Sequence, residues 1–116
     1  MNSKLLIILA LLLQLAFSTT AMSRSAANRN QLDSISLLGG LNGTALQCGY
    51  VEQMQRIKQA LILNLPKQRA LGDWFESSTN VEFLDFITSN KNCGSLAIFT
   101  LQVDDAIREL EDVFKK

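Results

Sequence analysis

The chain has 116 residues, of which eleven are Lys or Arg and eleven are Asp or Glu, so its formal net charge is zero. Proteins that bind nucleic acid or an anionic membrane surface usually carry an excess of basic residues clustered on one face, and this chain has no such excess. It contains no His, which removes the commonest general base and transition-metal ligand, and with them most hydrolase and metalloenzyme designs.

Residues 1–21 have the pattern of a cleavable secretory signal peptide. Lys4 precedes an apolar run, interrupted once, from Leu5 to Phe17, and small residues follow it. The run is shorter than the roughly 20 apolar residues that a membrane-spanning helix needs. We therefore expect cleavage after Ala21 and no membrane span in the mature chain. Export would lead to the periplasm of a bacterium or to the outside of a eukaryotic cell.

Export places Cys48 and Cys93 in a compartment where thiols are usually oxidised in pairs. We expect one intrachain disulfide between them. By closing a loop of about 46 residues, this bond would stabilise the small domain by roughly 4 kcal/mol. Two free or interchain thiols are the alternative, because a sequence does not show whether the two Cα atoms come close enough.

The first expected elements are a flexible arm and a short helix. Residues 22–31 are rich in Ser, Asn and Ala and have no apolar period, which is typical of a mobile segment. Residues 32–116 are expected to form one helical domain. Apolar residues recur at helical spacing over 32–41, and the glycine-containing pairs at 39–40 and 42–43 are expected to break that helix.

A long central helix is predicted from Thr44 to Asn64. Thr44 and Gln47 fit a capping box, in which two side chains satisfy backbone donors at a helix start. One broad face carries the apolar residues Leu46, Tyr50, Met54, Ile57, Leu61 and Leu65, flanked by Val51 and Ile62. Pro66 is expected to end this helix.

Two shorter helices are expected next, and Pro66 fits the first turn of the earlier one. The buried face of that helix contains Ala70, Leu71, Trp74 and Phe75. Thr79 and Glu82 form a second capping-box pattern, which predicts the start of the other helix. The apolar residues of this helix are Val81, Phe83, Leu84, Phe86 and Ile87. They leave little polar surface, so we expect the helix to be buried.

Ser95 is expected to cap a last helix from Leu96 to Phe114, after a loop at residues 89–94. Its apolar stripe comprises Leu96, Phe99, Val103, Ala106, Ile107, Leu110, Val113 and Phe114. No alternation typical of strands competes with the helical periods. The sequence therefore predicts an all-α fold, a small bundle of about four helices stapled by one disulfide after a cleaved signal peptide.

Ile98 and Leu101 fall outside the apolar stripe of the last helix. They either belong to an exposed contact surface or are covered by the amino-terminal segment or the loop near Cys93. Asp105 and Glu109, one turn apart, join this candidate contact surface from the acidic side of the helix. Such a face is usually solvated, so we expect no metal ion and no cofactor there.

Trp74, Phe83 and Phe86 are candidates for lining an apolar pocket, because aromatic side chains near a flexible Gly72-Asp73 backbone often do so. For Trp74, packing in the core is the favoured interpretation, since it lies at helical spacing from Leu71.

Asn42-Gly43-Thr44 matches the acceptor pattern for N-glycosylation and lies in an expected loop. A glycan on Asn42 is relevant only if the chain is exported by a eukaryotic cell.

Residues 46–50, Leu-Gln-Cys-Gly-Tyr, at the start of an expected helix resemble the Cys-containing first helix of small periplasmic immunity proteins that neutralise secreted bacterial amidases. The carboxy-terminal Cys and the Pro-containing segment of that family have no counterparts in this chain. The resemblance implies an inhibitor-type function.

Two function classes remain. The first is an exported, non-enzymatic binding or accessory factor that acts through protein contacts. The second is a carrier of a small apolar ligand, and a periplasmic immunity or inhibitor-type protein is kept with it as an alternative. An internal cavity lined by Trp74, Phe83 and Phe86 would favour the carrier, whereas a solid core with exposed Ile98 and Leu101 would favour the contact protein.

Overall fold

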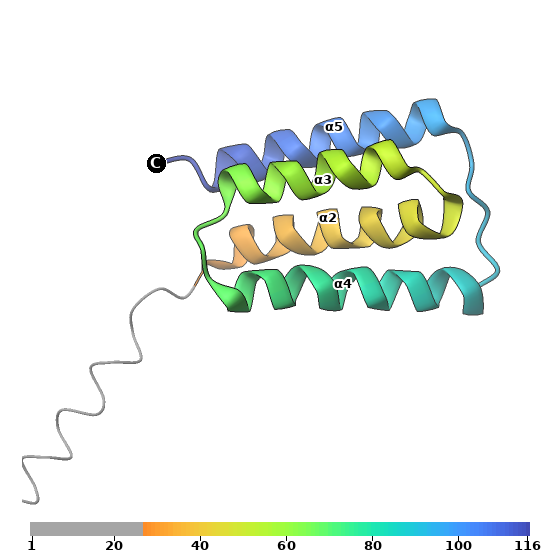
Figure 1. The fold of residues 1–116 in the computed structure, drawn as a ribbon, viewed down its shortest axis with the longest axis horizontal. Coiled ribbons are helices and arrows are strands. Elements are labelled where there is room, and N and C mark those ends of the chain that lie inside the picture. Colours follow the sequence, from red (N-terminus) through yellow and green to blue (C-terminus); the bar gives the residue numbers. More distant parts are fainter. Residues whose placement is uncertain (1–26) are drawn as a thin grey trace, which may run out of the picture.

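The computed structural model describes residues 27–116, which form an all-α fold (Figure 1). Its helices are α2 (Arg29–Cys48), α3 (Val51–Asn64), α4 (Arg69–Thr88) and α5 (Leu96–Val113). Within these residues there is no strand, so the predicted bundle of helices is confirmed. The expected signal peptide and the first part of the expected arm lie outside the described residues. None of the four helices combines the length and hydropathy that crossing a bilayer requires.

The helices are antiparallel to their neighbours in the chain, and α2 lies at the centre of the arrangement (Figure 1). It packs against α3, α4 and α5, and α3 also packs against α5. In contrast, α2 is the only helix whose backbone comes close to that of α4. Helix α4 is therefore attached mainly along α2, its buried Leu71 and Phe75 join the common core, and a surface hollow lies on each flank of the helix.

Helix α2 differs from the expected pattern at its start. Asn28 and Gln31 form a capping box. The Asn28 side chain accepts from the backbone amide of Gln31 at 2.9 Å, and the Gln31 side chain accepts from the backbone amide of Asn28 at 3.0 Å. The expectation that residues 28–31 belong to a flexible arm is therefore wrong, because these two side chains satisfy the first backbone donors of the helix.

The expected break in α2 also lies elsewhere. The helix passes through both glycine-containing pairs and ends at Gly49, whose positive φ of 71° is favourable for a residue without a side chain. The predicted helix start at Thr44 is therefore wrong, and α3 begins only at Val51. The predicted end of α3 at Asn64 is confirmed.

Helix α4 is continuous, so the predicted helix start at Thr79 is wrong. Thr79 lies in the middle of α4, and its hydroxyl donates to the Phe75 carbonyl at 3.0 Å instead of capping a new helix. Pro66 lies in the link before α4 rather than in its first turn. The predicted cap of α5 is confirmed, since the Ser95 hydroxyl accepts from the Ile98 amide at 3.5 Å.

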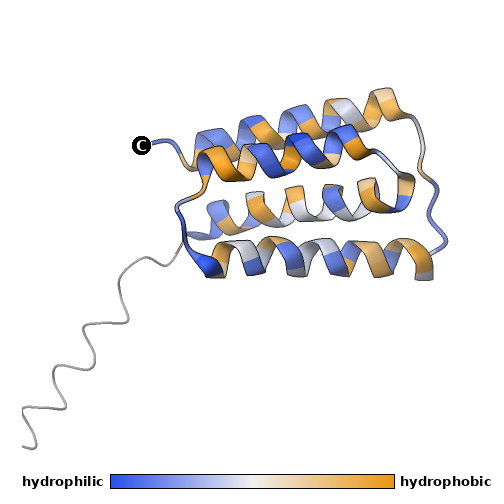
Figure 2. Ribbon diagram, in the orientation of Figure 1, coloured by the Kyte–Doolittle hydropathy of each residue, from blue (hydrophilic) through white to orange (hydrophobic). Residues whose placement is uncertain are grey.

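The core lies between α2, α3 and α5 and is continued by the buried side of α4. Hydrophobic residues recur along each of these helices (Figure 2). It contains Ile35, Leu38, Ala45, Ile57, Ala60, Leu61, Leu71, Phe75, Phe99, Val103, Ala106 and Leu110. The Phe99 ring packs against Tyr50 with centroids 5.2 Å apart. The predicted disulfide is confirmed: Cys48, at the end of α2, is bonded to Cys93 in the loop before α5, with Cα atoms 5.5 Å apart.

Candidate functional site

The seam between α2 and α4 is tight because glycines allow the two backbones to approach. A Cβ added to Gly39 would lie 2.5 Å from the Ser78 Cβ, and one added to Gly43 would lie 2.6 Å from the Thr79 carbonyl oxygen. Both distances are too short for real contacts, so these positions require glycine. Gly39 and Gly43 are four residues apart and therefore share one face of the helix. This spacing is the signal in the sequence that indicates a close helix contact rather than a helix break.

Asn42 lies in this seam rather than in a loop. Its side chain is buried, and its amide Nδ2 donates to the Thr79 hydroxyl at 3.3 Å. The expectation of a loop at the Asn42 acceptor pattern is therefore wrong. A glycan on Nδ2 is incompatible with the packed seam, because the acceptor nitrogen has no path to solvent.

Trp74 is exposed where core packing was expected. Its side chain is 45% exposed, and its indole Nε1 donates to the Leu32 carbonyl at 3.2 Å and to the Ser36 hydroxyl at 2.6 Å. Both acceptors belong to α2. The ring therefore lies across the edge of the seam in a fixed orientation, with much of its surface free.

A surface hollow runs beside this ring along the seam, and we call it the Trp74 groove. It has a volume of about 330 Å³. Its lining residues are Ser36, Gly40, Trp74, Ser77, Ser78, Val81 and Glu82. A second hollow of about 300 Å³ shares three of these residues and adds Leu37, Leu41 and Thr44. The small side chains of the seam form the groove, and exposed apolar groups stand on its edges.

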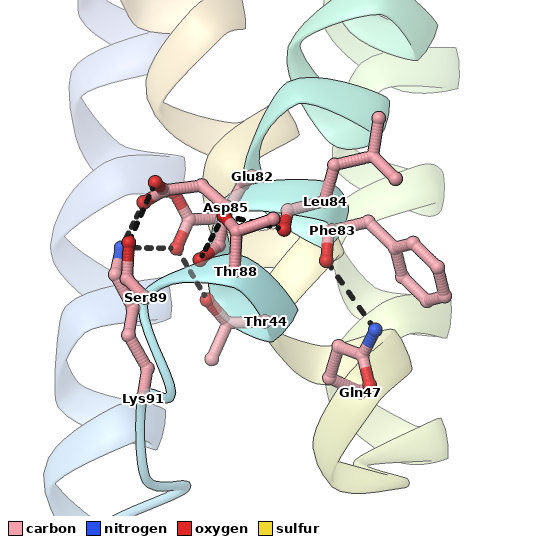
Figure 3. A network of polar contacts seen from close by, with 9 residues as sticks. All are labelled: Thr44, Gln47, Glu82, Phe83, Leu84, Asp85, Thr88, Ser89 and Lys91. Atoms are coloured by element: carbon pink, nitrogen blue, oxygen red, sulfur yellow. Dashed lines mark hydrogen bonds and ion pairs between the residues drawn. The ribbon is translucent and has the colours of Figure 1, made fainter.

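The groove ends at a polar network centred on Lys91 (Figure 3). The Lys91 ammonium contacts Glu82 at 2.9 Å and Asp85 at 2.7 Å, and the Thr44 hydroxyl donates to Glu82 at 3.5 Å. Hydrogen bonds from Lys91 and Ser89 lower the pKa of Asp85, and the two carboxylates raise the pKa of Lys91. The network therefore fixes the loop after α4 against the last turns of that helix.

The predicted contact residues on α5 are exposed. Ile98 is 61% and Leu101 is 62% exposed, so neither the amino-terminal end of the described chain nor the loop near Cys93 covers them. Asp105 and Glu109 are exposed on the same helix, and Asp105 pairs with Arg108. These four residues remain available as a second contact surface.

The three aromatic residues of the expected apolar pocket are not brought together in one hollow. Trp74 lines its groove, whereas Phe86 lines a separate hollow with Cys93 and Ile98. Phe83 contributes its backbone carbonyl to a hydrogen bond from Gln47 at 3.3 Å (Figure 3). In residues 27–116 no group of three or more acidic or Cys side chains is placed to hold a metal ion.

Comparisons with known proteins find no relative: no family model matches the sequence, and neither a curated protein nor a solved structure matches it.

Proposed function

We propose that this protein is an exported, non-enzymatic binding factor that acts by docking another protein in the Trp74 groove. The observation that carries the proposal is the half-exposed indole of Trp74, fixed by two hydrogen bonds. Tryptophan is among the residues that contribute most to protein interfaces. Because the ring is already oriented, binding costs little of its conformational entropy.

The distribution of apolar side chains supports a contact function. More large apolar residues are exposed than buried in the described part of the chain. The exposed ones are Leu37, Leu46, Val51, Ile62, Leu63, Trp74, Val81, Leu84, Ile87, Leu96, Ile98 and Leu101. Exposed apolar groups that gather along grooves and helix faces are typical of interaction sites.

The carrier of a small apolar ligand has less support. A ligand pocket buries most of its ligand. In contrast, the Trp74 groove is open, since Trp74 and Val81 on its edge are themselves exposed. Its shape fits a protruding side chain or helix of a partner better than an enclosed molecule.

Site-specific photocrosslinking in the native cell tests the proposal. A photoreactive amino acid at Ser77, on the groove, should give an adduct with one partner, while the same group at Gln59, exposed on α3, should not. Trp74→Ala should abolish the Ser77 adduct, and Trp74→Phe should retain part of it. Equal adducts at both positions, or an adduct unaffected by Trp74→Ala in a folded protein, would contradict the proposal.

With the partner purified, fluorescence gives the affinity directly, because Trp74 is the only Trp in the chain. Its emission should shift on binding as the exposed ring is buried. Loss of a hot-spot Trp typically costs 2 kcal/mol or more, so Trp74→Ala should weaken binding at least about 30-fold.

A further inference from the structure

The opposite flank of α4 carries a second groove, between α4 and α3. The backbones of these two helices do not come close to each other, and a surface hollow of about 280 Å³ lies between them. Leu61 and Phe75 form its apolar base, and Ile62, which is 80% exposed, stands on its α3 edge. Glu76 on the α4 edge is two residues from Trp74, so the two side chains point to opposite sides of the helix. This α3–α4 face is therefore distinct from the Trp74 groove.

Exposed apolar side chains also occur further along the same sides of both helices, beyond the polar Gln55 on α3 and Asn80 on α4. Val51 precedes Lys58 by two helical turns on α3, and Ile87 lies three turns beyond Glu76 on α4, so each pair shares a side of its helix. Val51 and Ile87 are both exposed. Because α3 and α4 are antiparallel, these two residues lie at the same end of the bundle (Figure 1).

The two charged side chains that line the hollow have opposite signs. Lys58 lies on the α3 edge and Glu76 on the α4 edge of the same hollow, and neither takes part in an ion pair within residues 27–116. From this arrangement we propose that the α3–α4 face binds a second copy of the chain, with a two-fold axis running along the groove.

This axis follows from the charges. A rotation about the groove direction places α3 of one copy on α4 of the other at the same height, so Lys58 meets Glu76 of the second copy at two equivalent positions. A two-fold axis across the groove would instead set Lys58 against Lys58 and Glu76 against Glu76. The like charges disfavour that alternative.

Shape agrees with the same pairing. Ile62 of one copy faces the space over Gly72 of the other, where an added Cβ would meet no atom within 4 Å. The face is about 21 Å long, from the length of the 14-residue α3, and about 20 Å wide, from two helix diameters. This is smaller than most stable specific interfaces, so the dimer is reversible and weak.

Charge reversal gives a sharp test with the purified, oxidised protein at low ionic strength. Sedimentation equilibrium should show a dimer for the wild type. Lys58→Glu and Glu76→Lys should each weaken it about 10-fold or more, because both contacts become repulsive. An equimolar mixture of the two variants should restore the affinity as a heterodimer, since every contact is again between opposite charges. A change in the stability of either monomer does not produce this rescue.

Ile62→Asp should also weaken the dimer, while Leu63→Asp is the matched control. Leu63 is 74% exposed but lies about 100° further round α3 and does not line the groove. Circular dichroism checks that all variants are folded. A wild type that stays monomeric at about 500 µM, far above a micromolar Kd, overturns the proposal. A mixture of the two charge variants that dimerises no more tightly than each variant alone also overturns it. The same holds if Leu63→Asp weakens the dimer as much as Ile62→Asp does.

The test is independent of the proposed function. Trp74→Ala should leave the dimer unchanged, because Trp74 lies on the other flank of α4. A monomeric wild type that gives a photocrosslink from position 62 to another protein would assign the α3–α4 face to a foreign helix and overturn self-association.

Discussion

The backbone of Gly43 in α2 lies directly against that of Thr79 in α4, so closely that a Cβ on Gly43 would be 2.6 Å from the Thr79 carbonyl oxygen. Gly43→Ala should therefore push the helices apart and lower the free energy of unfolding by about 1 to 3 kcal/mol, the usual range for overpacking. Gly39→Ala should act in the same way against Ser78.

Gly40 provides the matched control for this prediction. It lies in the same helix, but an added Cβ would meet no atom within 4 Å. Gly40→Ala should raise the free energy of unfolding by about 0.5 to 1 kcal/mol, because alanine loses less backbone entropy than glycine on folding. Urea denaturation of the three variants measures the difference, and equal effects at positions 40 and 43 would contradict the close seam.

Reduction of the Cys48–Cys93 disulfide should lower the stability markedly. The bond spans 45 residues in the sequence, and closing such a loop is worth roughly 4 kcal/mol in the chain-entropy account. Urea denaturation with and without a reductant measures this loss. The Cys48→Ser and Cys93→Ser double variant should match the reduced protein and be insensitive to the reductant.

The Lys91 network predicts a specific acid dependence. Since Lys91 and Ser89 lower the pKa of Asp85 in the folded state, the unfolded chain binds more protons between that pKa and about pH 4. The stabilisation by Asp85 is therefore complete above about pH 4 and is lost as the pH falls through the folded-state pKa. Thermal unfolding from pH 2.5 to 6 should show a smaller acid loss in Asp85→Asn. In Lys91→Met, NMR titration should show the pKa of Asp85 closer to its ordinary value.

Adjacent positions on α5 should respond in opposite ways to substitution. Phe99 is buried against Tyr50, so Phe99→Ala should cost about 3 to 5 kcal/mol of stability. Ile98→Ser and Leu101→Ser should change stability by less than about 0.5 kcal/mol, because both side chains are exposed. If α5 contributes to partner binding, the Ser variants should weaken association without unfolding, whereas Phe99→Ala should act only through unfolding.

The parts of the fold that depend on local chemistry could be predicted from the sequence. Pro66 cannot continue a helix, and the Ser95 hydroxyl caps one, so the end of α3 and the start of α5 were correct. The disulfide was also correct, because two cysteines allow only one pairing within the chain.

The errors arose where packing between helices outweighs local patterns. Thr44 and Thr79 both resemble helix caps in the sequence, yet both lie inside long helices. Thr44 instead donates to Glu82, and Thr79 accepts from Asn42. Gly39 and Gly43 resemble helix breakers but serve the close approach of α4. The Trp74 groove depends on this approach, so periodicity along a single helix could not indicate it.

The attachment of α4 by one seam has a thermodynamic consequence. Because the backbone of α4 approaches only that of α2, and this seam is the most extensive contact between helices, α4 can separate from the bundle only if the whole seam opens at once, and the loop anchored at Cys93 limits how far it moves. Any molecule that binds one flank of α4 only while α4 is packed against α2 suppresses this opening. It therefore also favours the binding of a second molecule to the other flank. Binding of the proposed partner in the Trp74 groove should therefore strengthen the proposed association through the α3–α4 face, although the two surfaces share no lining residue.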